Sequence, residues 1–484
     1  MAERLDAVVV GAGPNGLAAA LTLARAGRSV EVLEAAEVVG GGARTEELTL
    51  PGFRHDVCSA VHPTAVASPF LRQVEADLAA HGLRWIQPEA PLAHPFDDRP
   101  AAVLEGSVTA TADGLDATGW GGGASWRRLY GPLATRADDL AAVVLAPFRF
   151  PRHPLLMARF GLVGLPPARL TARLLGSDGA RALLLGAASH AAVPLDRPPT
   201  AAFGLFLTAL GQGRGWPIAA GGSGAISAAL AAAVEARGGR ISVGRPVASA
   251  ADLPPARTVL FDLTPRQLVA IGGERLPAGY RRRLEGFRYG PGVFKLDWAL
   301  AEPIPWRDPA VARAGTAHLA GSLDDLHAAL DAERHGRPAE RPFVILSQPS
   351  RWDPSRAPEG RHTAWAYCHV PQDSTVDMTA AMEAQVERFA PGFGDLILGR
   401  SALGPAAMEA HDANHVGGSI DGGLQDWRQL FTRPVLARVP YRLPAHGPDG
   451  AGWYCCSSST PPGSGVHGMS GWWAAQAALR RELA

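Results

Sequence analysis

The chain reads DAVVVGAGPNGLAAALTLARAG over residues 6–27: an apolar run, the glycine pattern Gly11-x-Gly13-x-x-Gly16, and a stretch rich in alanine and leucine. This order predicts a strand, a tight turn and a helix, which begin a dinucleotide-binding unit. Gly11 permits the tight turn, Gly13 leaves room for a pyrophosphate at the backbone, and Gly16 lets the helix pack closely on the strand. The amino end of the helix then faces the phosphates.

An acidic residue stands where such a unit needs one. Residues 30–33 predict a second apolar strand, and Glu34 ends it 18 residues after Gly16. A carboxylate at about this position accepts hydrogen bonds from an adenosine ribose. Because a strand, a helix and an acid accompany the glycines, we interpret the pattern as a dinucleotide site. The pattern alone leaves NAD and FAD open.

The segment that follows favours FAD. Residues 40–45, GGGART, bring together glycine backbone N–H groups and the fixed cation of Arg44, a combination suited to a diphosphate. This segment resembles the glycine-pair and arginine motif of the FAD family that holds amine oxidases and phytoene desaturases. Residues 461–469, PPGSGVHGM, closely resemble the final FAD motif of phytoene desaturase-like proteins, including those grouped with the pyridine nucleotide-disulfide oxidoreductase domain-containing protein 2.

A third match lies in the middle of the chain. Residues 216–243 resemble the family's middle FAD segment, in which the residue at Val247 holds the adenine edge through its main chain; apolar packing without cofactor contact is the alternative. Matches in this order imply an α/β fold with a discontinuous Rossmann-type FAD-binding domain and an interleaved α+β substrate domain, which carries a mixed sheet and a helical cap. We place the FAD-binding domain at residues 1–75, 205–289 and 440–484, the substrate domain at 76–204 and 290–439, and the cap at about 124–200.

The resemblance implies FAD as the cofactor and a set of residues that bind it. A last helix that starts at Gly468 and Met469 would point its amino end at the flavin N1 and C2 atoms, where negative charge gathers on reduction. The expected FAD-binding residues are Gly11, Gly13, Pro14, Asn15, Gly16, Glu34, Gly41, Gly42, Ala43, Arg44, His62, Val247, Gly463, Val466, Gly468 and Met469.

Two residues are candidates for catalysis. Lys295 is the only lysine of the chain, and residues 292–296, GVFKL, resemble the strand whose lysine reaches the flavin N5 through a water in amine oxidases. A cation there would help electron transfer to dioxygen; a surface lysine is the alternative. His467, in the turn before the last helix, would face the flavin or the substrate, or would only satisfy backbone groups.

Composition narrows the partners. The formal net charge is +0 and no basic block occurs, which argues against nucleic acid. The cysteines form no Cys-x-x-Cys pair, and the glycines of residues 411–423 indicate a backbone approach to the flavin ring, so no metal site is expected. No leader precedes the first strand and no apolar run is long enough to span a bilayer, so we expect a cytoplasmic protein.

The segment 124–190 carries apolar residues at helical spacing and is interpreted as a cap over the substrate cavity. Between Leu140 and Leu162 it is strongly apolar. We favour burial of these side chains in a core, and leave a peripheral membrane contact open as the alternative. Before the cap, residues 109–123 are predicted to be an acidic loop.

These features favour an FAD-dependent oxidoreductase of desaturase or dehydrogenase type that removes hydride from a small, mostly apolar organic substrate. The pattern Gly211-x-Gly213-x-Gly215 has the wrong spacing for a second dinucleotide unit and no strand before it, so we expect reoxidation by oxygen or a quinone. The alternatives are a flavin amine oxidase, favoured by Lys295, a redox-neutral FAD isomerase, and a non-catalytic lipid-binding protein of the same fold.

Overall fold

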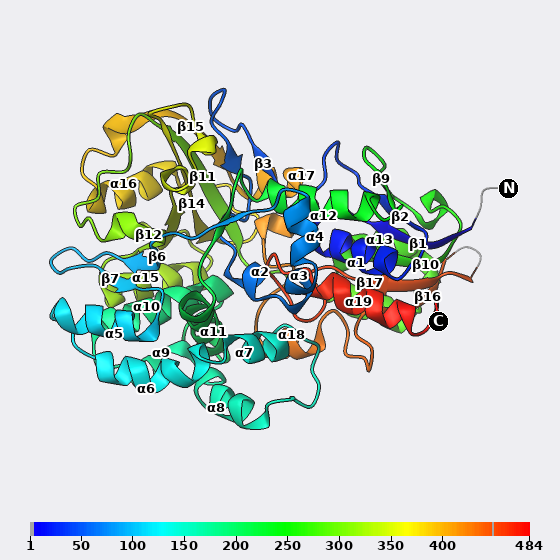
Figure 1. Ribbon diagram of the computed structural model, residues 1–484, viewed down its shortest axis with the longest axis horizontal. Helices are drawn as coiled ribbons and strands as arrows, with labels where there is room; N and C mark the ends of the chain where they lie inside the picture. The colour runs from blue at the N-terminus through cyan, green and yellow to red at the C-terminus, as the bar shows by residue number, and fades with distance from the viewer. Residues whose placement is uncertain (1–3, 448–449) are drawn as a thin grey trace.

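The first sheet is assembled from stretches that lie far apart in the chain. The computed structural model describes residues 4–447 and 450–484, and Figure 1 shows its two large sheets toward opposite ends of the molecule. The strand order of the first sheet is β16-β17-β10-β1-β2-β9, parallel except for the edge pair β16 and β17. Its strands are β1 (Leu5–Val10), β2 (Val30–Leu33), β9 (Arg240–Ser242), β10 (Ala256–Phe261), β16 (Arg442–His446) and β17 (Gly452–Cys455).

Helices cover both faces of this sheet because its strands are apolar on both sides, as is typical of parallel sheets. Alternate residues of β1 enter different cores: Val9 packs in the core that holds α1 and α19, and Val8 in the core that holds α13 and α14. Two helices approach very closely, since a Cβ added at Gly471 would lie 1.8 Å from the Asn15 carbonyl oxygen. The helices are α1 (Pro14–Arg25), α12 (Gly224–Glu235), α13 (Pro265–Gly272), α14 (Ala278–Glu285) and α19 (Met469–Leu479).

The second sheet, called here the floor sheet, has the order β15-β11-β14-β13-β12-β6-β7 and is antiparallel except between β6 and β12. The predicted mixed sheet is therefore present. Its strands are β6 (Ala90–His94), β7 (Ala102–Leu104), β11 (Gly292–Leu300), β12 (Ala314–Leu319), β13 (Val344–Ser347), β14 (His362–Val370) and β15 (Ile397–Leu403).

One row of side chains crosses the floor sheet. Lys295 of β11 pairs with Tyr367 of β14, Tyr367 with Ile345 of β13, and Ile345 with His318 of β12. Directly opposed residues of antiparallel strands point to the same face of a sheet. The row therefore lies on one face, which looks toward the cap, while the other face packs against α16 (Thr379–Phe389).

The cap consists of short helices that lie along the lower side of the molecule in Figure 1. Two small antiparallel pairs lie outside the large sheets: β3 (Thr45–Glu46) with β4 (His55–Asp56), and β5 (Trp85–Ile86) with β8 (Ile218–Ala219). The remaining helices are α2 (Pro63–Ala67), α3 (Pro69–Gln73), α4 (Glu75–Ala80), α15 (Leu323–Arg334), α17 (Pro405–His411) and α18 (Trp427–Thr432). The cap helices are α5 (Val108–Ala117), α6 (Gly123–Ala134), α7 (Ala137–Val144), α8 (Pro154–Gly164), α9 (Ala168–Ala172), α10 (Asp178–Ala188) and α11 (Thr200–Gly213).

The prediction of a loop over residues 109–123 is wrong, because most of this segment forms the helix α5. The hydroxyl of Ser107 accepts a hydrogen bond from the Ala110 backbone N–H at 3.1 Å and caps the first turn. Thr111 and Leu115 are buried four residues apart on one face of the helix. Two acidic residues on its exposed face led the interpretation toward a loop.

The apolar stretch of the cap is only partly a core. Leu140 and Phe160 are buried as predicted, but α8 packs one face on α9 and α11 and turns another face to solvent. The prediction of a buried core is therefore wrong for part of the stretch. The exposed fractions of the four side chains concerned are 90% for Phe148, 87% for Phe150, 85% for Leu155 and 78% for Leu162.

Candidate active site

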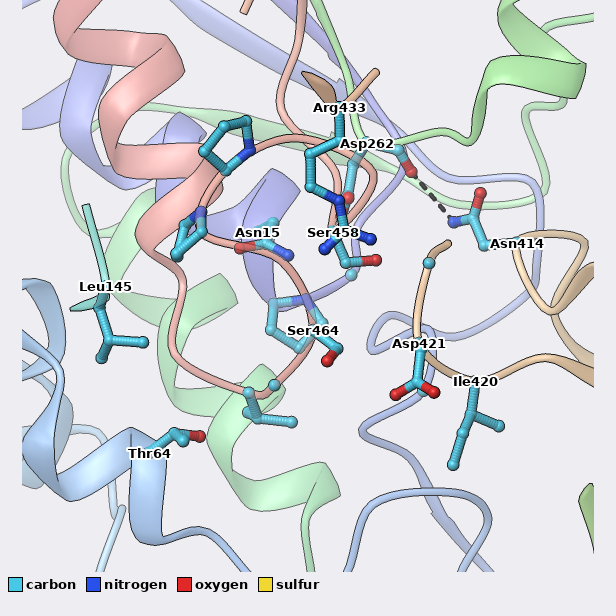
Figure 2. A pocket seen from close by; sticks show the side chains of 18 of the residues that line it. Asn15, Thr64, Leu145, Asp262, Asn414, Ile420, Asp421, Arg433, Ser458 and Ser464 are labelled. Atoms are coloured by element: carbon cyan, nitrogen blue, oxygen red, sulfur yellow. Dashed lines mark hydrogen bonds between the residues drawn. The ribbon is translucent and has the colours of Figure 1, made fainter. Parts of the chain in front are cut away.

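A cavity of about 2010 Å³ lies between the first sheet, the cap and the floor sheet. A small-molecule site typically occupies about 300–1,000 Å³, so this cavity has room for a dinucleotide and a second molecule together. One end is lined by the loop after β1, and the other by apolar side chains that include Phe160 and Phe206 of the cap. Figure 2 shows side chains around this pocket at close range.

Two glycine loops form the nucleotide end. Gly11 has φ +98°, a left-handed backbone that favours glycine. A Cβ added at Gly13 would lie 2.7 Å from Oδ2 of Asp262, and one added at Gly41 would lie 3.3 Å from the Gly13 Cα. The loops after β1 and β2 therefore touch, and side chains at these positions would fill the space that a diphosphate needs.

Glu34 and Arg44 lie beside these loops and line the cavity, where the sequence predicts them. Oε2 of Glu34 accepts a hydrogen bond from the Ala12 backbone N–H at 2.6 Å. Arg44 is 9% exposed; its Nε donates to the Gly41 carbonyl at 2.9 Å and its Nη2 to the His411 carbonyl at 2.7 Å. The carboxylate and the cation are thus held in fixed positions, one suited to a ribose and the other to a diphosphate.

Asp262, directly after β10, is a site residue that the sequence pattern does not single out. Its Oδ2 accepts a hydrogen bond from the Gly16 backbone N–H at 2.8 Å, and its backbone carbonyl accepts one from the Asn414 side chain at 3.1 Å, drawn dashed in Figure 2. Burial raises the pKa of Asp262 to about 8, so the carboxyl group keeps its proton at neutral pH. A neutral carboxyl group beneath the glycine loop does not repel a diphosphate.

The structure divides the predicted FAD-binding residues into two groups. Some lie behind the cavity surface because packing requires them: a Cβ at Gly16 would lie 2.0 Å from the Gly11 carbonyl oxygen, and one at Gly468 would lie 2.8 Å from the Ala18 Cβ. The residues that line the cavity are Gly11, Gly13, Pro14, Asn15, Glu34, Gly41, Gly42, Arg44, Val247 and Val466. Those that do not line it are Gly16, Ala43, His62, Gly463, Gly468 and Met469.

His467 lies inside the protein and does not line the cavity. Its Nδ1 accepts a hydrogen bond from the Met469 backbone N–H at 3.0 Å, at the amino end of α19. Burial lowers the pKa of His467 to about 4, so the ring is neutral at physiological pH. This geometry matches the alternative in which the histidine satisfies a backbone group, and the catalytic role of His467 stays a prediction without a cavity contact.

Lys295 also lies beneath the cavity wall. It is 1% exposed, and its ammonium group pairs with Asp297. Nδ1 of His55, in the β3–β4 hairpin, lies 3.5 Å from Oδ1 of Asp297, so the hairpin covers the pair. Burial raises the pKa of Asp297 to about 6, and Lys295 opposes that rise. The alternative of a surface lysine is excluded, while a role of Lys295 toward oxygen stays a prediction.

Substitution of Lys295 by methionine is expected to destabilise the fold. It leaves Asp297 buried without its cation, and breaking a buried ion pair costs about 3–5 kcal/mol. The double variant Lys295→Met/Asp297→Asn removes both charges and should regain most of the loss in thermal unfolding. Equal melting temperatures for wild type and single variant would contradict this expectation. The double variant then allows the role toward oxygen to be measured on a stable protein, by the rate of flavin reoxidation in air.

Polar groups from residues 411–433 also line the cavity. Asp421 is 9% exposed and Arg433 is 1% exposed, and both line the cavity. Nη2 of Arg433 donates to the Gly423 carbonyl at 3.2 Å. Burial raises the pKa of Asp421 to about 7, and the charge of Arg433 opposes that rise. Figure 2 shows Asp421 beside Ser464, with its carboxyl group turned toward the pocket. A carboxyl group that titrates near neutral pH at such a place can act as a proton acceptor.

His415 and Cys58 lie together beside the second glycine loop and line the cavity. A Cβ added at Gly42 would lie 3.4 Å from Nε2 of His415. Burial disfavours the charged ring, but Asp412, with a carboxylate oxygen 4.0 Å away, and Cys58 raise the pKa of His415 to about 9. His415 is therefore a second cation, besides Arg44, on this part of the cavity wall, and it belongs to the 411–423 segment that the sequence places near the flavin.

The far end of the cavity, called here the chamber, is apolar and aromatic. Trp365 and Tyr367 of β14 form part of its wall, with ring centroids 5.3 Å apart and planes at 72°. Ile345 of the floor sheet and Phe206 of α11 complete it. These two aromatic rings and the chamber depend on strand register, which no local sequence pattern reports.

No group of three or more histidine, cysteine, aspartate or glutamate side chains in residues 4–447 and 450–484 could hold a metal ion. Within the same described ranges, no helix combines the length and apolarity that crossing a membrane requires.

Known proteins share this architecture. A family model of the NAD(P)-binding Rossmann-like domain matches residues 9–76. The chain is 27% identical to the pyridine nucleotide-disulfide oxidoreductase domain-containing protein 2 of Rattus norvegicus, over 96% of its own length and 92% of that protein. It is similar in fold to an oxidoreductase from Methanosarcina mazei (TM-score 0.62, 16% identity, 99% and 100% of the two chains) and to cyclohexylamine oxidase from Brevibacterium oxydans (0.57, 16%, 99% and 100%).

The chain therefore has the fold of these oxidoreductases. The predicted resemblance and the predicted fold class are confirmed. The site offers the groups that the expected FAD needs: Glu34 supplies a carboxylate suited to a ribose, and Arg44 and the two glycine loops supply a cation and backbone N–H groups suited to a diphosphate. Oδ1 of Asn15 is buried in the cavity wall without a hydrogen-bond partner in the described chain, as expected of an atom whose partner is a ligand.

Proposed function

We propose that this protein is an FAD-dependent oxidoreductase that removes hydride from a mostly apolar organic substrate and forms a carbon–carbon or carbon–nitrogen double bond. One observation carries the proposal: a single cavity joins the glycine loops to the apolar chamber, and Asp421 lines it close enough to His415 and to Tyr367 to interact electrostatically with both. When bound, FAD supplies the hydride acceptor. The reaction also releases a proton, which Asp421 is placed to accept because its pKa is about 7.

The proposal includes reoxidation by oxygen or a quinone. Gly211 and Gly213 lie at the end of the helix α11, and Gly215 follows it, so this pattern is not a loop that could receive a second dinucleotide. The positive charge of His415 on the cavity wall is suited to stabilising negative charge that develops during reoxidation.

A second candidate function is the oxidation of an amine. Trp365 and Tyr367 present aromatic rings to the chamber, and Asp421 supplies a nearby carboxylate. Aromatic faces and a carboxylate both attract an ammonium group. The putrescine oxidase of Kocuria rosea is 62% identical over 47 residues, which cover 10% of this chain, so this likeness is local.

Anaerobic titration of the yellow protein tests both functions. Two sets of compounds are added in the absence of oxygen: apolar olefins and saturated ketones in the first set, and primary amines in the second. Bleaching of the flavin absorbance is recorded for each compound. Bleaching by the apolar compounds supports desaturation, and bleaching by amines alone supports the second candidate. Bound flavin that no compound bleaches would contradict both, and would favour an isomerase or a binding protein.

We propose further that the mouth of the chamber rests on an anionic lipid surface. Phe148 and Leu436 are exposed and also line the cavity, so an apolar rim continues into the chamber. Phe148 meets Phe431 edge-on across the rim, with ring centroids 5.8 Å apart. The exposed Arg149 and Arg152 lie among these residues. Apolar side chains interleaved with arginines suit a headgroup layer, from which an apolar substrate could enter directly.

For the double variant Phe148→Asp/Phe150→Asp, the affinity for vesicles of phosphatidylcholine and phosphatidylglycerol is expected to fall about 10-fold or more. Burial of one phenylalanine side chain contributes a free energy of about 1.5–3 kcal/mol. Leu398→Asp, at an exposed position of β15 away from the rim, serves as the matched control. Sedimentation with vesicles measures the bound fraction. Equal binding of wild type and double variant would remove the lipid surface from the proposal.

A further inference from the structure

A pair of histidines joins the cap to the floor sheet at the wall of the chamber. His190 lies in the short 3-10 helix Ser189–Ala191 that follows α10, and His318 lies on β12. Their Nε2 atoms are 3.0 Å apart, within hydrogen-bond distance. His190 lines the cavity, whereas His318 is fully buried behind it.

Both rings are neutral at physiological pH. Burial lowers the pKa of His190 to about 4 and that of His318 well below its ordinary value. The neighbouring rings of His94 and His369 are buried as well, and burial lowers the pKa of each to about 4. In a neutral pair one Nε2 donates the hydrogen bond and the other accepts it.

The surroundings of His318 decide which ring donates. Its Nδ1 is buried without a partner in the described chain and faces the backbone of α10, where a Cβ at Gly186 would lie 2.5 Å away. A proton on Nδ1 would be a buried N–H without an acceptor, which is rarer in proteins than an acceptor without a donor. His318 therefore carries its proton on Nε2 and donates to His190. His190 accepts at Nε2 and carries its own proton on Nδ1.

Nδ1 of His190 makes no hydrogen bond to the described part of the chain. Two indole N–H groups lie in the same wall. That of Trp216 donates to Thr316 at 2.9 Å, and that of Trp365 is buried without a partner among the described residues. A ligand that pairs with the free donors of His190 and Trp365 has to bring an acceptor.

The backbone beside this group is strained. Ala192, two residues after His190, has φ +50° and ψ +38°, the left-handed region that costs a residue with a side chain about 1 kcal/mol or more. The strained turn ends the segment that sets His190 against His318. Strain of this kind persists where neighbouring contacts hold the segment in place, and the hydrogen bond between the two rings is one such contact.

From this geometry we infer that Nδ1–H of His190 binds an uncharged oxygen of the substrate, such as the carbonyl of a ketone, ester or amide. The inference rests on the proposed function and names the substrate class more closely: an apolar molecule that carries an acceptor oxygen. A pure hydrocarbon would fill the chamber but leave the N–H unpaired, and a carboxylate would have to shed its water in an apolar chamber.

Two ligands of nearly the same shape test the inference: a 2-alkanone and the 2-methyl-1-alkene of equal length. The ketone carries an acceptor oxygen at the position where the alkene carries a CH₂ group. Binding of each to the FAD-loaded protein is measured by calorimetry and by tryptophan fluorescence. Wild type is expected to bind the ketone about 10-fold more tightly than the alkene, because one net hydrogen bond changes the affinity by about this factor. His190→Phe should lose this preference, and His190→Asn, which keeps a donor, should retain part of it.

Equal binding of the two ligands by wild type would overturn the inference. So would an equal loss of both ligands in His190→Phe, which would show a role in packing alone. Binding is measured without turnover, so the two proposals can fail separately. A ketone preference that depends on His190, in a protein whose flavin no compound bleaches, would keep the histidine site and reject the oxidoreductase function.

Discussion

Gly16→Ala is expected to yield a protein that retains almost no flavin. The added Cβ would lie 2.0 Å from the Gly11 carbonyl oxygen and 3.1 Å from Oδ2 of Asp262. Because one of these atoms belongs to the backbone of the turn, the loop after β1 has to move, and the diphosphate loses its cradle. Gly471→Ala should act in the same way, since its Cβ would lie 1.8 Å from the Asn15 carbonyl oxygen.

The ratio of flavin to protein absorbance after purification measures this effect. Gly114→Ala is the matched control, because a Cβ at that position of α5 meets no atom within 4 Å and alanine favours a helix over glycine. The control should purify with the flavin content of wild type. A full flavin content in Gly16→Ala would refute the assignment of the loop after β1 to the diphosphate.

Asp421→Asn is expected to slow anaerobic flavin reduction by about 100-fold, the lower range for loss of a general base. The pH dependence gives a sharper test. In wild type the ionised carboxylate accepts the proton, so the rate should rise with pH through about 7, the pKa of Asp421, and level off above it. The variant has no such group and should show no step near pH 7.

Loss of the Asp421 charge also affects Arg433, so the flavin content and melting temperature of the variant have to be compared with wild type. Asp98→Asn, at an exposed position, is the control for a change of charge alone. Unaltered rates and an unaltered pH profile in Asp421→Asn would exclude Asp421 as the proton acceptor. A lower rate that keeps the step near pH 7 would assign the step to another group.

The nucleotide end of the site could be predicted from local sequence patterns because its residues lie close together in the sequence. Gly11 and Gly13 lie in a single turn, and Glu34 ends the next strand, so spacing alone places them on the cavity. Lys295 shows where this reasoning stops. The strand that carries it, β11, is present as predicted, and the Lys295 side chain lies on the face of the floor sheet that looks toward the cap. The β3–β4 hairpin nevertheless covers this side chain. Which residue is covered depends on contacts between distant segments.

The polar groups of the junction depend on contacts of the same kind. Asp421 and Arg433 come from irregular segments without a repeating pattern, and only their common cavity makes them a site. Helical spacing likewise predicted the cap but could not report which face of α8 has a partner, or that the segment before α8 is exposed, so Leu155 and Phe148 were assigned to a core. Composition records how many apolar residues a segment has, whereas burial depends on what packs against them.

The interleaved order of the first sheet has a consequence for biosynthesis. Strand β10 gains its neighbour β17 only after about 190 further residues have left the ribosome, and α1 waits even longer for α19. Until then the nascent chain carries an open sheet edge and an uncovered apolar helix face, both hazards for aggregation. The compartment that begins at β1 therefore stays open until α19 has been synthesised and has packed against α1.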